Sequence, residues 1–137
     1  MKFQYSDGGR SNYFTGITGD CVTRSFTNAL DKDYLEVYRL VNQICENQKK
    51  ESEIIRGLSL GYTIEDGNAR DGVYPRTIRM IAKHFNLKFK RKNGKTKNLK
   101  KGKYIVLQYG HLTCVNDGIL LDTHDCSCDK HIGYFKV

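Results

Sequence analysis

The sequence predicts an α+β fold in which N-terminal helices pack on a C-terminal twisted antiparallel sheet. Hydrophobic residues recur at helical spacing between residues 21 and 85, and short β-like runs follow from residue 87. Helices grouped before strands, rather than alternating with them, are typical of this class. The length of 137 residues predicts one domain, residues 1–137, because two cores would each bury too little surface.

Three helices are expected after a turn-rich N-terminal segment, residues 1–20, which is rich in Gly, Ser, Asn and Thr. The first helix covers residues 21–30, where hydrophobic residues four apart share one face. The second begins at Asp33, because Glu36 lies three residues later in the capping-box position. The third begins near Pro75, since proline is favoured at the first position of a helix.

The rest of the chain is expected to form strands and loops. Residues 51–72 mix charged residues with glycines and predict neither a helix nor a strand. Short β-like runs cover residues 87–90, 104–109, 112–115, 119–122 and 132–137. Asp117-Gly118 separates two of these runs and is typical of a two-residue hairpin turn.

Composition excludes several classes of protein. The hydrophobic content of 39% and the single proline are those of a folded domain rather than a disordered chain. No apolar run approaches the roughly 20 residues that a membrane helix needs, so no membrane association is expected. The N-terminus has no apolar stretch typical of an export signal, which predicts a cytoplasmic protein. The five cysteines of the chain are therefore expected to be free thiols.

A basic segment, residues 88–103, holds nine of the Lys and Arg residues and no acidic residue. Such a segment could contact the phosphate backbone of a nucleic acid. It is also typical of a solvated loop between two strands. The loop is favoured, because the segment lacks the stacking aromatic residues that single-strand binders use.

Cys21 is the first candidate for chemistry, because it stands at the expected start of a helix. A helix N-terminus carries unpaired N–H groups and a partial positive charge. Both lower the pKa of a thiol, and the N–H groups can also hold an oxyanion.

His111 and Asp122 flank the expected hairpin turn. A two-residue turn at Asp117-Gly118 pairs position 116 with 119 and position 113 with 122. His111 and Asp122 then become diagonal neighbours on the same face, within reach of each other's side chains. The carboxylate can accept a hydrogen bond from one ring nitrogen and leave the other facing a thiolate.

Two segments of the chain carry a family resemblance. One reads Gly19-Asp-Cys-Val-Thr-Arg-Ser-Phe-Thr-Asn-Ala-Leu and continues with Lys32-Asp-Tyr-Leu-Glu-Val-Tyr38. The other contains Gly110-His111, Asp117-Gly118 and Asp122-Thr-His-Asp-Cys-Ser127. Over residues 19–40 and 103–135, the chain resembles small papain-like cysteine peptidase-type proteins of bacteriophages and bacteria.

The resemblance implies a papain-like fold with Cys21 as nucleophile, His111 as base and Asp122 as the residue that orients the base. It also implies the cytoplasm of a bacterial host if the chain is phage-encoded. Arg24 matches an arginine of the family pattern, where it would steady the thiolate, bind a substrate carboxylate or pair with a buried acid. The last of these roles is favoured.

The chain departs from papain-like enzymes at the oxyanion donor. Those enzymes supply a donor, commonly Gln, a few residues before the cysteine, but residues 13–20 contain neither Gln nor Asn. Thr18 or the more distant Asn12 is the candidate substitute, with the Cys21 backbone N–H as the other donor.

A further group of residues has the chemistry of metal ligands: His124, Cys126, Cys128 and His131. Structural zinc sites usually separate two ligand pairs by a loop, and the C-x-C spacing here is tight. The sequence therefore predicts no metal site and no cofactor.

The expected function is that of a thiol-dependent hydrolase or acyltransferase, which attacks an amide, isopeptide or thioester carbonyl of a peptide or protein substrate. The alternative is a catalytically weak or inactive papain-like scaffold that binds a host protein or a nucleic acid.

Overall fold

The computed structural model describes residues 1–16, 18–57 and 67–137. Within these ranges the chain forms three α-helices, two short 3₁₀ helices and a six-stranded sheet. The helices are α1 (Cys21–Leu30), α2 (Tyr34–Gly57) and α3 (Pro75–His84), and the 3₁₀ helices are Arg10–Asn12 and Thr96–Asn98. The strands are β1 (Lys2–Tyr5), β2 (Phe89–Lys95), β3 (Lys103–Gln108), β4 (His111–Asn116), β5 (Ile119–Asp122) and β6 (Lys130–Lys136).

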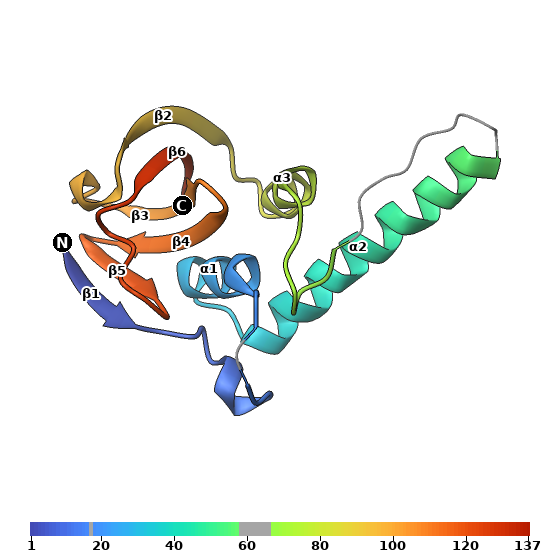
Figure 1. Cartoon of the computed structure of the whole chain (residues 1–137), viewed down its shortest axis with the longest axis horizontal. Coiled ribbons are helices and arrows are strands. Elements are labelled where there is room, and N and C mark those ends of the chain that lie inside the picture. Colours follow the sequence, from blue (N-terminus) through green and yellow to red (C-terminus); the bar gives the residue numbers. More distant parts are fainter. Residues whose placement is uncertain (17, 58–66) are drawn as a thin grey trace.

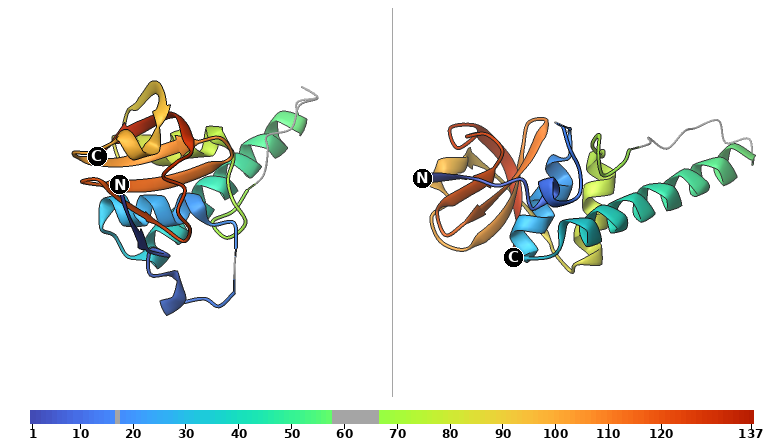
Figure 2. Two further views of the ribbon diagram at one scale, coloured as in Figure 1. Left: turned by 60° about the vertical axis from the view of Figure 1, so that its left-hand side comes forward. Right: turned by 90° about the horizontal axis from the view of Figure 1, so that it is seen from below.

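The strands follow the order β1-β5-β4-β3-β6-β2 across the sheet. Figure 2 shows the three helices on one side of this twisted sheet, and Figure 1 shows the far end of α2 extending away from it. The predicted α+β class and the packing of helices against a sheet are therefore confirmed. None of the helices in the described ranges combines the length and hydrophobicity that a bilayer crossing requires.

The predicted all-antiparallel sheet is wrong at one edge, because β1 pairs with β5 in parallel. Backbone hydrogen bonds from Lys2 to Gly118 and from Ser6 to Asp122 hold β1 in place. All four residues of β1 are exposed, so the strand has none of the alternation between buried and exposed positions by which strands are recognised.

The basic segment also differs from its predicted structure. Residues 89–95 form the edge strand β2, which pairs with β6 and has a register shift between Arg91 and Gly94. Gly133 permits this pairing, because a Cβ there would lie 2.4 Å from the Lys90 carbonyl oxygen. Lysine-rich edge strands discourage pairing with other chains, which gives these charges a structural role.

The first residues of the helices were predicted more accurately than the last residues. The helices begin at Cys21, directly after Asp33, and at Pro75, as expected. However, α2 continues to Gly57, so the expectation that no helix occurs after residue 50 is wrong for residues 51–57. Residues 58–66 of that segment lie outside the described ranges.

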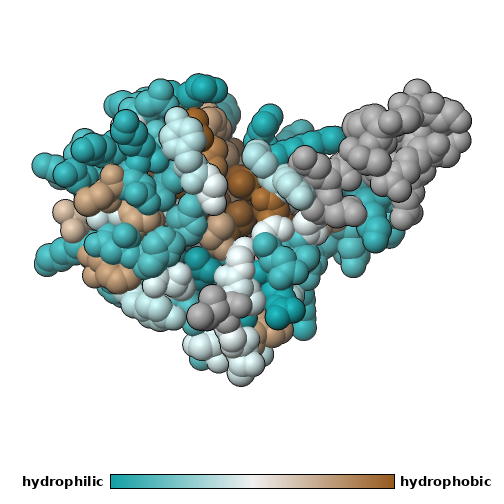
Figure 3. Space-filling view, viewed as in Figure 1, coloured by the Kyte–Doolittle hydropathy of each residue, from teal (hydrophilic) through white to brown (hydrophobic). Residues whose placement is uncertain are grey.

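The main core lies between the helices and the sheet. It contains Val22 and Phe26 of α1, Val37 and Val41 of α2, Ile78 and Ile81 of α3, and Ile105, Leu112 and Phe135 of the sheet. A smaller cluster lies apart from it and includes Val106, Val115 and Leu120. Ile105 and Val106 belong to different clusters because successive side chains of a strand point to opposite faces. Figure 3 shows the surface hollowed between the sheet and the helices, with hydrophobic residues in the hollow.

The β4–β5 hairpin has the predicted register. Asn116 pairs with Ile119, and both turn residues, Asp117 (φ 47°) and Gly118 (φ 79°), adopt left-handed conformations. This is the backbone pattern of the tight hairpin turn that Asp-Gly favours. The register places His111 and Asp122 on the same face of the sheet.

Candidate active site

Cys21 begins α1, and His111 begins β4, the strand on which α1 packs. The Ser25 hydroxyl joins the two elements, since it lies 2.7 Å from the Cys21 carbonyl oxygen and 2.8 Å from that of Leu112. The Leu112 backbone N–H and the His111 ring both act on the Cys21 thiol, because each lowers its pKa. The structure thus brings together two residues that are ninety positions apart in the chain.

The His111 ring is held by Asp122. Its Nε2 lies 2.7 Å from Asp122 Oδ2, which confirms the diagonal contact predicted from the hairpin. The Asp122 carboxylate also accepts the Thr123 backbone N–H at 2.7 Å. Because Nε2 is engaged by the carboxylate, Nδ1 is the ring nitrogen left for the thiol.

The charges of the three residues depend on these contacts. Burial alone would raise the pKa of the Cys21 thiol, but hydrogen bonds from His111 and Leu112 bring it below its ordinary value. Burial opposes charge on His111 as well, yet hydrogen bonds to Asp122, Cys126 and Cys21 raise its pKa to about 11. The pKa of Asp122 is held far below its usual range despite burial, chiefly by His111. The contacts therefore shift Cys21 toward the thiolate and His111 toward the imidazolium, relative to the isolated side chains.

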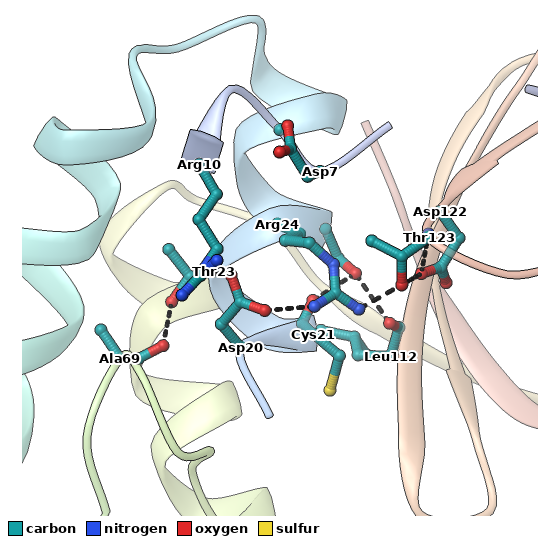
Figure 4. Close-up of polar contacts among 12 residues, drawn as sticks. Asp7, Arg10, Asp20, Cys21, Thr23, Arg24, Ala69, Leu112, Asp122 and Thr123 are labelled. Atoms are coloured by element: carbon teal, nitrogen blue, oxygen red, sulfur yellow. Dashed lines mark hydrogen bonds and ion pairs between the residues drawn. The ribbon is translucent and has the colours of Figure 1, made fainter. Parts of the chain in front are cut away.

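Arg24 connects the start of α1 to the hairpin (Figure 4). Its guanidinium pairs with Asp20, the residue before Cys21, and lies 3.3 Å from Asp122 Oδ1. Asp20 also accepts a hydrogen bond from the Tyr34 hydroxyl at 2.6 Å and lies 3.5 Å from Arg10 Nε. Both aspartates are almost fully buried, so pairing with arginine is what permits them to remain charged. Arg24 thus has the favoured role, pairing with buried acids.

Sequence reasoning missed Asp20 and Arg10 as parts of this network. Asp20 and Arg24 are four residues apart, a spacing that places side chains on the same side of a helix and could have predicted their contact. Arg10 gave no such signal. It is buried and also donates to the carbonyl oxygens of Thr15 and Gly16, so it supports the segment that leads into Cys21.

The two candidate oxyanion donors lie in different surroundings. The Thr18 hydroxyl is buried and has no hydrogen-bond partner within the described ranges. Asn12 is exposed at the end of a 3₁₀ helix, with its amide against Gly9. The Cys21 backbone N–H lies in the first turn of α1, where helical N–H groups have no acceptor within the helix. Of the two candidates, Thr18 is thus the one whose buried hydroxyl has no partner within the described ranges.

A cavity of about 600 Å³ adjoins this network. Thr18, Asp20, Arg24 and Thr123 contribute to its lining. The cavity borders Asp20 and Arg24, whereas Cys21 and His111 are not part of its lining. The cavity therefore belongs to the surroundings of the site.

The four metal-type residues considered from the sequence do not form one cluster. His124 and Cys126 lie near His111. Cys128 is exposed, and the His131 ring packs on Tyr134 in β6. Cys128 and His131 thus lie apart from His124 and Cys126, and the four residues do not form one metal site.

Comparison with known proteins does not identify the chain. No protein-family model matches it, and no curated protein or solved structure gives a significant match. A function therefore has to be inferred from the residues themselves and from the sequence resemblance described above.

Replacing Arg24 by methionine should destabilise the protein by about 3 kcal/mol, because it removes the guanidinium that two buried carboxylates share. Urea denaturation measures this change. Lys32→Met is the matched control, since Lys32 lies 3.6 Å from Glu36 in an exposed pair and should cost less than about 1 kcal/mol. Equal small changes in both variants would contradict the role assigned to Arg24.

Replacing His111 by alanine should shift alkylation of Cys21 by iodoacetamide to higher pH. Without the imidazolium, burial dominates and raises the pKa of the thiol, so the thiolate forms only in more alkaline solution. Peptide mass spectrometry over a pH series measures the rate at Cys21. The exposed Cys128 thiol is the internal reference, and an unchanged profile at Cys21 would show that His111 does not activate it.

Proposed function

We propose that the protein is a papain-like thiol hydrolase or acyltransferase in which Cys21 is the nucleophile, His111 the general acid and base, and Asp122 the residue that orients His111. The observation that carries the proposal is the 2.7 Å contact between His111 Nε2 and Asp122 Oδ2, made by a ring that also lowers the pKa of the Cys21 thiol. The sequence resemblance supports the same three roles. The placement of Cys21 at a helix start against the strand that carries His111 supports a papain-like arrangement.

The reaction follows from the charge states. The Cys21 thiolate attacks the carbonyl carbon of an amide, isopeptide or thioester, and a carbon–sulfur bond forms as the carbonyl oxygen becomes negative. The Cys21 backbone N–H and the Thr18 hydroxyl are the donors for that oxyanion. The His111 imidazolium gives its proton to the departing amine or thiol, which leaves a thioester on Cys21.

The second half of the reaction uses the neutral ring of His111. The ring takes a proton from water or from an acceptor amine, which attacks the thioester and releases the acyl group from Cys21. Water gives hydrolysis and an amine gives acyl transfer. Asp122 keeps Nδ1 directed at the reacting atoms in both halves, because Nε2 is bound to the carboxylate. The proposed substrate is a peptide or protein.

Replacing Cys21 by alanine should abolish formation of an acyl-enzyme from p-nitrophenyl acetate, because the proposed thioester forms on the Cys21 sulfur. Intact-protein mass spectrometry detects the acetyl adduct, and circular dichroism confirms that the fold is retained. Cys128→Ala is the matched control and should acylate like the unaltered chain, since Cys128 is exposed and lies outside the triad. Equal acylation of the Cys21→Ala variant would refute the assignment of the nucleophile.

A second candidate function, nucleic-acid binding, is favoured by the exposure of β2. Six of the seven residues of this strand are exposed, and they include Lys90, Arg91 and Lys92. A positively charged edge of this kind can follow a phosphate backbone without reading sequence.

If β2 binds nucleic acid, fluorescence anisotropy should show binding of a labelled single-stranded DNA. This binding should weaken steeply between about 50 and about 200 mM salt, a range that brackets the physiological concentration. The double variant Lys90→Glu/Lys92→Glu should bind at least about tenfold more weakly and with a smaller salt dependence, because fewer counterions are released. Lys49→Glu/Lys50→Glu, at two exposed lysines of α2, is the charge-matched control and should bind like the unaltered chain. Binding that ignores salt would contradict this function.

A further inference from the structure

His111 has a second group of neighbours besides the thiol. Potential ligand atoms of His111, His124 and Cys126 lie within 4.8 Å of one another. The His111 and His124 rings are 4.9 Å apart between centroids. The Cys126 sulfur lies 3.7 Å from Asp122 Oδ2, the same oxygen that contacts His111 Nε2.

These three side chains have the chemistry that zinc prefers. Zinc bonds imidazole nitrogen at about 2.0–2.1 Å and thiolate sulfur at about 2.3 Å, in tetrahedral geometry. Tetrahedral ligands at those bond lengths are separated by roughly 3.3–3.8 Å. Because their present separations are up to 4.8 Å, the three atoms need to approach one another by at most about 1–1.5 Å.

The surroundings of the cluster also fit an ion. His124 is exposed, so a cation can enter from solvent, whereas Cys126 is buried and held against Asp122. Arg24 occupies the other oxygen of Asp122, as Figure 4 shows from the α1 side. Asp122 Oδ2 is thus the oxygen that can complete the site, either as fourth ligand or as acceptor for a ligand's N–H.

We propose that His111, His124 and Cys126 form a binding site for a divalent cation of the zinc class. The site is different from the tetrad considered from the sequence, because it replaces Cys128 and His131 by His111. It is also different from a simple cysteine–histidine chelate, because it does not use Cys21.

The consequence for catalysis rests on the proposed hydrolase function. A metal ion bonded to a nitrogen of His111 prevents the ring from carrying both protons of the imidazolium. The single N–H that the ring keeps is a far weaker acid than the imidazolium, so proton transfer to the leaving group and acylation of Cys21 slow strongly. Zinc is therefore a reversible inhibitor that acts on the base.

The test measures cobalt and zinc binding to the Cys21→Ser variant, in which the reactive thiol is absent. Cobalt should bind in a one-to-one ratio with a thiolate-to-metal charge-transfer band, and zinc should displace it. Removing either of two ligands, in His124→Ala or Cys126→Ser added to that background, should weaken binding at least about tenfold. The matched controls are His84→Ala and Cys128→Ser. They replace an exposed histidine and an exposed cysteine outside the cluster, so the affinity for the metal should stay unchanged.

Loss of binding in Cys21→Ser itself would overturn the proposal in favour of a chelate that contains the reactive thiol. Unchanged affinity in His124→Ala would overturn it as well, and this exposed position does not endanger the fold. A loss of metal affinity in Cys128→Ser would instead support the site of four residues between 124 and 131 that was considered from the sequence. Binding is read directly in a chain that lacks the nucleophile, so the result does not depend on whether the protein is a hydrolase.

Discussion

The arrangement of the site depends on one buried guanidinium. Arg24 bonds the carboxylate that precedes Cys21 and the carboxylate that holds His111, so it fixes the start of α1 relative to the β4–β5 hairpin. The two halves of the candidate triad come from distant parts of the chain, and nothing in the hairpin by itself would place the thiol. Because both aspartates are buried, either would be unfavourable as an unpaired charge. The ion pairs and the catalytic geometry therefore form together.

Asp122 takes part in two networks at once. Oδ1 accepts from Arg24 and from the Thr123 backbone N–H, whereas Oδ2 faces His111 and the Cys126 thiol. Within a single carboxylate, one oxygen thus holds α1 and the other holds the ring that we propose as the base. It also explains why the pKa of His111 is high although the ring is partly buried, since burial alone would act in the opposite direction.

His111 lies between two thiols of different character. Cys21 is half-buried at a helix start, where hydrogen bonds lower its pKa. Cys126 is buried behind the ring and contacts the carboxylate. A base with a reactive thiol on one side and metal-type ligands on the other can be used for acyl chemistry or withdrawn from it. The same ring nitrogen chemistry that makes imidazole a good base makes it a good ligand for zinc.

Local patterns in the sequence determined the start of each helix and the register of the central hairpin. Asp117-Gly118 and the two-residue periodicity of strands were sufficient to bring His111 beside Asp122, because that contact lies within one turn and its flanking strands. The edge strand β1 escaped prediction, and β2 was predicted only at residues 89 and 90, because the residues of both strands are almost all exposed. Only the tertiary structure decided the contact between Arg10 and Asp20. It also decided that His124 and Cys126 lie beside His111 and apart from Cys128 and His131. Those contacts depend on how separate elements pack, and spacing along the chain carries no information about it.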